Sequence, residues 1–311
     1  MDNENHYYCR ALYLATDPTK PDTDEDGLLD SEDPNPLVKD IIKSSITNEN
    51  YIRINHNGNI SFGSAQGWLK EYPYNTYCNG KISAEFASKK GCGFIVGADV
   101  LAYFNIYKHL SMIEYADKLG CNAGTTVVGN RIDLWQYMGY DKNINTINYN
   151  DYIKYLSLLS NKLTISDGNI TGVYPFLIPT SLQSMFNDVF NTCNLPYKAT
   201  WGLSGDFVIT YIRIEEMIKN NIPVILSFDK GNSDEGISIY YTDGANNFIE
   251  SQKLSSHYVT ITGIIEYSDA MANKIGHKRM LEVSSWGEKF YIDYDEYSTF
   301  MSPFTNILYI N

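Results

Sequence analysis

GCGFIVGADVLAYF, residues 91–104, is the stretch from which the fold can be predicted. It sets one cysteine between two glycines, ahead of an apolar run that contains alanines. Val100, Leu101 and Phe104 recur at helical spacing, so the run predicts a buried helix with Cys92 at or just before its N-terminus. There the helix dipole and the unbonded backbone N–H groups favour a thiolate over a thiol. Cys92 is therefore a candidate nucleophile, and the alternative is a structural cysteine at a tight turn.

Length, charge and cysteine content limit the possible classes. The 311 residues suffice for one large domain or for a domain with a small module. The formal net charge of −13 and the lack of a basic patch among aromatic residues argue against a nucleic-acid partner. No apolar run approaches the roughly 18 residues of a membrane span, and the N-terminus has no signal-peptide core. The five cysteines are an odd number without a Cys-x-x-Cys pair, which does not suit a disulfide scaffold.

Residues 22–33 have the spacing of a calcium-binding loop. Aspartates stand at relative positions 1, 3, 5, 9 and 12, and Gly27 stands at position 6, where such a loop turns sharply. Leu28 is at position 7, where a backbone carbonyl can bind, and Ca²⁺ prefers several hard oxygen ligands around one point. The alternative is a solvated acidic linker. The predicted ligands are Asp22, Asp24, Asp26, Leu28, Asp30 and Asp33.

This segment resembles the calcium loops of EF-hand, dockerin and thrombospondin type-3 repeats, and the last two more closely. It differs from the EF-hand because position 12 is Asp33 and not glutamate. The prolines at 34 and 36 mark a boundary, so we expect a calcium-binding acidic segment over residues 1–40 and the main domain over 41–311. Loops of this kind suit millimolar extracellular calcium, which favours a secreted or cell-surface protein.

The remaining chain predicts helices first and strands afterwards. We expect a short helix over 37–42, a hairpin over 51–62 with an Asn57-Gly58 turn, and a helix from Cys92 to about residue 119. Further helices are expected near 150–163, 180–193 and 206–220. Strands are then expected at 224–228, 236–242, 246–251, 257–267, 279–285, 289–293 and 306–310. This order predicts an α+β domain with an antiparallel sheet.

The strongest signal outside the cysteine helix is SHYVTITG, residues 256–263. His257 opens a strand in which Val259 and Ile261 alternate with polar residues, so the sheet would fix its ring opposite the helix N-terminus. His257 is a candidate general base, and the alternative is a buried structural histidine whose ring nitrogens are hydrogen-bonded within the core. Residues 281–294, LEVSSWGEKFYIDY, then predict a strand, a tight Trp-Gly turn and a second strand, with Trp286 shielding the site.

Taken in order, these three segments resemble the papain-like cysteine peptidases over about residues 45–311. The Gly-Cys-Gly run is closer to the bacteriocin-leader-peptidase-like branch found in bacteria. The resemblance implies a papain-like fold in which Cys92 is the nucleophile and His257 the general base. The position that orients the histidine in the family holds Ser284 here instead of Asn or Asp. Phe86 replaces the family's oxyanion-hole glutamine, so Gln66 is the candidate for that role.

The resemblance implies a cysteine peptidase that acts on a peptide or protein substrate and needs no cofactor for catalysis. Transfer to an amine instead of water would use the same two residues. The alternative from another class is a non-catalytic binding or adhesion module of a bacterial surface protein, with the calcium loop as a rigid spacer. Ser284 and the absence of glutamine at position 86 favour that alternative, while the presence of both Cys92 and His257 argues against it.

Overall fold

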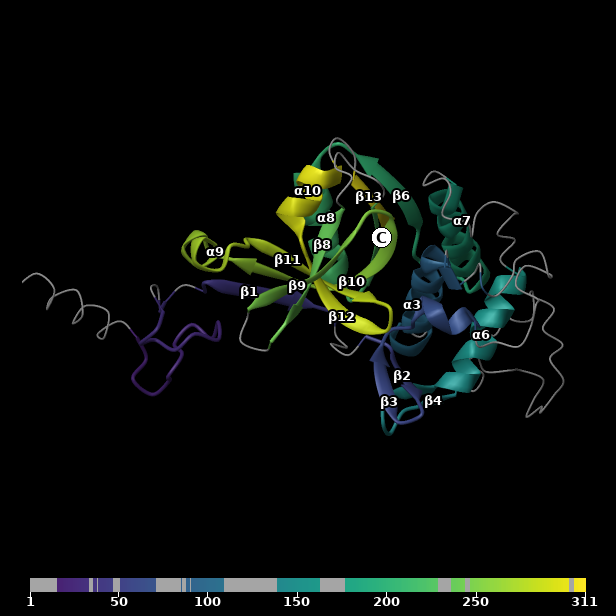
Figure 1. The fold of residues 1–311 in the computed structure, drawn as a ribbon, viewed down its shortest axis with the longest axis horizontal. Coiled ribbons are helices and arrows are strands. Elements are labelled where there is room, and N and C mark those ends of the chain that lie inside the picture. Colours follow the sequence, from purple (N-terminus) through teal and green to yellow (C-terminus); the bar gives the residue numbers. More distant parts are fainter. Residues whose placement is uncertain are drawn as a thin grey trace, which may run out of the picture.

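The computed structural model describes residues 16–33, 36–37, 39–46, 51–70, 85, 88–89, 91–108, 139–162, 177–228, 236–243, 247–301 and 305–311. Within them the chain is an α+β protein with six α-helices, a nine-stranded antiparallel sheet and a four-stranded mixed sheet (Figure 1). The predicted fold class and antiparallel sheet are confirmed. None of the helices in these ranges is both long and apolar enough to cross a bilayer.

Strand β10, His257–Tyr267, organises the large sheet. Its first half pairs with β7 (Val224–Phe228), its second half pairs with β1 (Ile41–Ser45), and its other edge pairs with β11 (Arg279–Ser285). Its first eight residues are all buried, as expected for a central strand. On one side of β10 the sheet continues through β7 to β13 (Thr305–Ile310) and β6 (Ala199–Ser204). On the other side it continues through β11 to β12 (Glu288–Asp293), β8 (Ile237–Thr242) and β9 (Phe248–Leu254).

The cysteine helix α3, Cys92–Tyr107, is the central helix. Every residue from Gly93 to Ile106 is buried, so other elements surround it on all sides. Helices α6 (Tyr149–Lys162) and α7 (Leu177–Thr192) lie beside it on the right of Figure 1. The predicted buried helix is confirmed, but it ends at Tyr107, and residues 109–119 of the expected extension lie outside the described residues.

The small sheet contains β3 (Asn59–Phe62), the strand from which the chain runs on to Gln66. Its order is β3, β2 (Arg53–His56), β5 (Thr146–Asn148) and β4 (Tyr140–Asp141). The predicted hairpin is confirmed, because Asn57 and Gly58 form the β2–β3 turn with φ of 54° and 88°. A short 3₁₀ helix, η1 (Gln66–Lys70), follows β3.

The short helix predicted over 37–42 is wrong, because Ile41 and Ile42 begin strand β1. The apolar residues at 37, 38, 41 and 42 have helical spacing, but pairing with β10 decides the local structure. The helix predicted near 206–220 is α8 (Phe207–Lys219). The side chain of Asp206 caps this helix by accepting a hydrogen bond from the Ile209 N–H. Two helices that the sequence analysis did not identify are α9 (Asp269–Ile275) and α10 (Tyr294–Met301).

Candidate active site and metal centre

Cys92 is the first residue of α3 and is half-buried. The N-cap residue is Gly91, and no side chain forms a capping hydrogen bond there. The N–H groups of the first turn are therefore not occupied by a capping side chain, and the positive end of the helix dipole faces the thiol region. This setting favours negative charge on sulfur, which a nucleophilic cysteine requires.

His257 is the first residue of β10, where its backbone pairs opposite Phe228 of β7. The residue is 8% exposed, and its ring stacks on Trp286 with 4.8 Å between centroids and 26° between planes. This burial disfavours the charged form and lowers the pKa of His257 from 6.5 to about 4. At neutral pH the ring is therefore an uncharged imidazole that can accept a proton.

One narrow pocket brings the separate sequence signals together. All four residues predicted for catalysis contribute to its lining, and they come from η1, α3, β10 and β11. Ser64, Asp99, Ser285 and Trp286 also line it. The lining residues that were predicted for catalysis are Gln66, Cys92, His257 and Ser284.

Gln66 begins η1 and holds its side-chain amide in a defined orientation. Its Nε2 donates to the carbonyl oxygen of Ser88 at 2.8 Å, so the amide nitrogen and oxygen cannot exchange places without losing this bond. Its Oε1 is buried and has no hydrogen-bond partner among the described residues. The second N–H of Nε2 can donate to another acceptor, which is what an oxyanion site requires.

The hydrogen bond to the imidazole that was expected of Ser284 is made by Ser285. His257 Nε2 and Ser285 Oγ are 2.8 Å apart. Ser284 Oγ instead donates to the carbonyl oxygen of Phe62, also at 2.8 Å. The difference between the two serines follows from strand geometry, because the side chains of neighbouring strand residues point to opposite faces of the sheet.

The two adjacent serines give a matched test. Ser285→Ala removes the partner of Nε2, so we expect kcat to fall by about 10-fold, since a positioned proton-transfer group loses its preferred tautomer. Ser284→Ala removes a hydrogen bond of the fold and is expected to lower the free energy of unfolding by about 1 kcal/mol with little change in kcat. Steady-state kinetics and urea unfolding of both variants check this. The reverse pattern would return the orienting role to Ser284.

Trp286 and Gly287 form the tight turn between β11 and β12. Their φ angles are 51° and 81°, and the left-handed region is unusual for a tryptophan. In this conformation the indole stacks on His257 and is perpendicular to Phe290, with 86° between the ring planes. The strained backbone therefore holds the imidazole in a fixed plane, as strain near functional sites often does.

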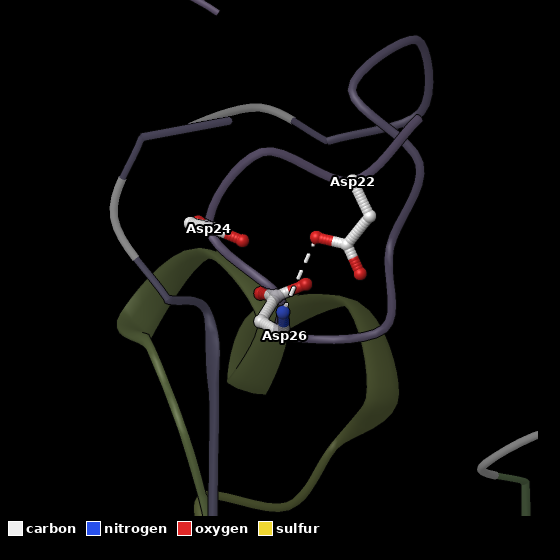
Figure 2. Close-up of side chains that lie close together, drawn as sticks. All are labelled: Asp22, Asp24 and Asp26. Carbon is white, nitrogen blue, oxygen red and sulfur yellow. Dashed lines mark hydrogen bonds between the residues drawn. The ribbon is translucent and has the colours of Figure 1, made fainter. Parts of the chain in front are cut away.

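The N-terminal loop gathers three carboxylates. Oxygen atoms of Asp22, Asp24 and Asp26 lie within 4.8 Å of one another, and Figure 2 shows the side chains converging. Both carboxylate oxygens of Asp24 are buried without a hydrogen-bond partner among the described residues, and burial followed by the charge of Asp26 raises the pKa of Asp24. Several acidic oxygens around one point fit a hard cation, which would neutralise their repulsion.

Asp30 and Asp33, two of the other predicted metal ligands, are not among these three carboxylates, and the role of the Leu28 carbonyl stays a prediction. Asp30 accepts hydrogen bonds from the backbone N–H and the hydroxyl of Thr23, at 2.7 and 2.8 Å, so it closes the loop. The N–H of Leu28 donates to Asp26 Oδ1 at 2.8 Å. Asp33 is buried but does not belong to the group of three. The cluster is therefore Asp22, Asp24 and Asp26.

The loop is attached directly to the large sheet. Asp26 Oδ2 accepts from the backbone N–H groups of Asp40 and Ile41, at 2.7 and 3.2 Å. Ile41 is the first residue of β1, and Leu28 packs against the apolar cluster that contains Ile41 and Tyr267. The carboxylate of Asp26 thus belongs both to the acidic cluster and to the start of a strand that pairs with β10.

No protein-family model matches this chain, and no curated protein matches it either. The function is therefore argued from the residues and their geometry. The sequence analysis assigned no functional role to three polar residues of the pocket, namely Ser64, Asp99 and Ser285. An acid within an otherwise apolar helix, seven positions after the candidate nucleophile, is the signal that could have identified Asp99.

Proposed function

We propose that the chain is a cysteine peptidase of papain-like fold that hydrolyses peptide bonds with Cys92 as nucleophile and His257 as general base. One observation carries the proposal: Cys92, at the N-terminus of a buried helix, and His257, at the start of the central strand, line the same pocket. A nucleophile and a base on different elements at one pocket are the minimum that thiol acyl transfer needs.

The proton route follows from the partner of the imidazole. If His257 Nε2–H donates to Ser285 Oγ, then Nδ1 carries the lone pair that accepts the Cys92 proton. The sulfur attacks the carbonyl carbon, and the imidazolium formed returns the proton to the leaving amine as the C–N bond breaks. Water then attacks the thioester, gives a proton to Nδ1 and releases the acid. The thiolate charge beside the ring offsets the burial that keeps the resting imidazole neutral.

The oxyanion of the tetrahedral intermediate needs hydrogen-bond donors near Cys92. The backbone N–H of Cys92 belongs to the first turn of α3, and the second N–H of Gln66 Nε2 is the side-chain candidate. One such donor is typically worth about 3 kcal/mol of transition-state stabilisation. Gln66→Ala is therefore the variant that separates this role from that of the thiol and imidazole.

The rate at which iodoacetamide alkylates Cys92, measured against pH, tests the proposal. In the thiolate–imidazolium pair the positive ring lowers the pKa of the Cys92 thiol, so we expect the alkylation rate of wild type to persist well below the ordinary thiol pKa. In His257→Ala the rate should follow an ordinary thiol, with a pKa near ~8.5, and be slower by at least about 10-fold at pH 6.

Mass spectrometry locates the labelled cysteine, and Cys92→Ser is the control for modification elsewhere. A single titration near ~8.5 that His257→Ala does not change would overturn the thiol–imidazole pair. The chain would then be better described as the binding or adhesion module that is the alternative to an enzyme.

We further propose that the cluster of Asp22, Asp24 and Asp26 binds Ca²⁺. The support is the convergence of three carboxylates and the two unpartnered buried oxygens of Asp24. Calcium would supply positive charge between these side chains and so hold the loop against β1 through Asp26. Sites of this kind with millimolar affinity suit a secreted or cell-surface protein.

A further inference from the structure

Asp99 is a buried acid that the mechanism above does not use. It is 2% exposed and lies on α3 seven residues after Cys92. Seven residues are almost two full turns, so the two side chains leave the same face of the helix about 10 Å apart along its axis. Both line the same pocket. Burying a carboxylate is costly, and it is retained only where hydrogen bonds compensate it.

The compensating hydrogen bonds come from the loop that precedes Gln66. Asp99 Oδ2 accepts from the backbone N–H of Ser64 at 2.9 Å, and Oδ1 accepts from the Ser64 hydroxyl at 2.6 Å. The hydroxyl of Tyr152, on α6, also donates to Oδ1. Burial raises the pKa of Asp99 to about 6, and the bonds from Ser64 and Tyr152 act in the opposite direction. The carboxylate therefore fixes both hydrogen-bond donors of one loop residue, Ser64, to α3.

Gly63 shows how closely this loop approaches its neighbours. Its φ is +78°, and a Cβ there would lie 3.0 Å from Asp99 Oδ2 and 2.2 Å from Ser284 Oγ. Any other residue at position 63 would therefore displace Asp99, Ser284 or the loop. The backbone between β3 and η1 therefore passes close to side chains of both α3 and β11.

Gln66 depends on this attachment for its place in the pocket. It follows Ser64 by two residues, and the one hydrogen bond that its side chain makes among the described residues is to Ser88. A donor for an oxyanion must be held in position before the reaction begins, because mobility reduces its contribution. The side-chain bond to Ser88 orients the amide, while the position of its backbone is set by the neighbouring residues of the loop.

We propose that Asp99 is a positioning residue, whose paired hydrogen bonds to Ser64 place Gln66 beside Cys92 so that its amide can donate to the oxyanion. This inference rests on the proposed peptidase function. Asp99 acts through the Ser64–Gln66 loop, because its hydrogen bonds to Ser64 fix that loop to α3. The proposal predicts that removing these hydrogen bonds weakens the stabilisation of the oxyanion and leaves the thiol–imidazole pair intact.

Three substitutions separate the attachment from general stability. Asp99→Leu removes all three hydrogen bonds. Asp99→Asn can keep them, because its oxygen can accept from the Ser64 N–H while its two amide hydrogens face the hydroxyls of Ser64 and Tyr152, which then accept. Tyr152→Phe is the matched control, since it removes the hydroxyl that donates to the same carboxylate and leaves both bonds between Asp99 and Ser64.

The measurements are amide hydrogen exchange at Ser64 and Gln66, alkylation of Cys92 by iodoacetamide, and kcat and KM for casein hydrolysis. For Asp99→Leu we expect exchange at least about 10-fold faster and kcat lower by about 100-fold, with alkylation and KM within about 2-fold of wild type. Asp99→Asn and Tyr152→Phe should stay within about 3-fold of wild type in exchange and kcat.

Two results would overturn the inference. One is exchange at Ser64 that is unchanged in Asp99→Leu. The other is a loss of alkylation equal to the loss of hydrolysis, which would mean that the whole pocket is disturbed. If Asp99→Leu does not fold, Ser64→Ala takes its place, because it removes only the bond from the hydroxyl. Ser64→Ala should then show smaller changes of the same kind, and wild-type values in that variant count against the proposal. If wild type hydrolyses no casein, the peptidase proposal fails separately, while hydrogen exchange still decides the attachment.

Discussion

Cys92→Ala, His257→Ala and the double variant are expected to lose the same factor in kcat, at least about 1,000-fold, when casein hydrolysis is measured. The equality of the three losses in kcat is what tests whether the thiol and the imidazole act together. Without the imidazole the thiol lacks the base that activates it, and without the thiol the imidazole has no proton to transfer. Two groups that act as one unit therefore give losses that do not multiply.

The control for this experiment is Cys193→Ala. Cys193 is also half-buried, but it follows α7 and is not among the residues that line the pocket. This variant should keep kcat within about 2-fold of wild type, because Cys193 does not line the pocket. A double variant that loses the product of the two single losses would mean that Cys92 and His257 contribute independently. That result would contradict the proposed dyad.

The residues at the ends of the two central elements could be predicted because their signals are local. The apolar run after Cys92 has helical periodicity, and the alternation after His257 is that of a strand, so both elements begin where the sequence indicates. Their positions follow from the fold class, which the order of helices and strands predicts. Short patterns place only the ends of these elements, and the expectation that the two segments meet at one site comes from the resemblance to the papain-like peptidases.

The polar details could not be predicted, because they depend on contacts between elements. Ser284 and Ser285 are identical side chains, and the pairing of β11 decides which of them faces the imidazole. Likewise, β1 has helical spacing in its sequence, but its pairing with β10 overrides that pattern. Asp99 acquires its partner from a loop 35 residues earlier, which no local pattern reveals.

Calcium is expected to reverse the effect of Asp24→Asn on stability. Without the ion, the three carboxylates repel one another and the Asp24 oxygens are unpartnered, so neutralising one side chain should raise the melting temperature. With calcium at 100 times its dissociation constant, binding stabilises the wild type by about 2.7 kcal/mol, and a variant that lacks one anionic ligand gains less. Asp24→Asn should therefore melt above wild type in EDTA and below it in millimolar calcium.

The effect should reach the large sheet, because Asp26 bonds to the first residue of β1 as well as facing the cluster. Calcium should therefore slow hydrogen exchange of the β1 amides, which the thermal measurement alone would not resolve. Asp141→Asn is the matched control, since it removes the same charge from an exposed residue of β4, and its melting temperature should respond to calcium as the wild type does. If calcium leaves the wild-type melting temperature unchanged, the loop is an acidic linker and not a calcium site. The same conclusion follows if magnesium raises the melting temperature equally, because magnesium demands a smaller octahedral arrangement of ligands than calcium.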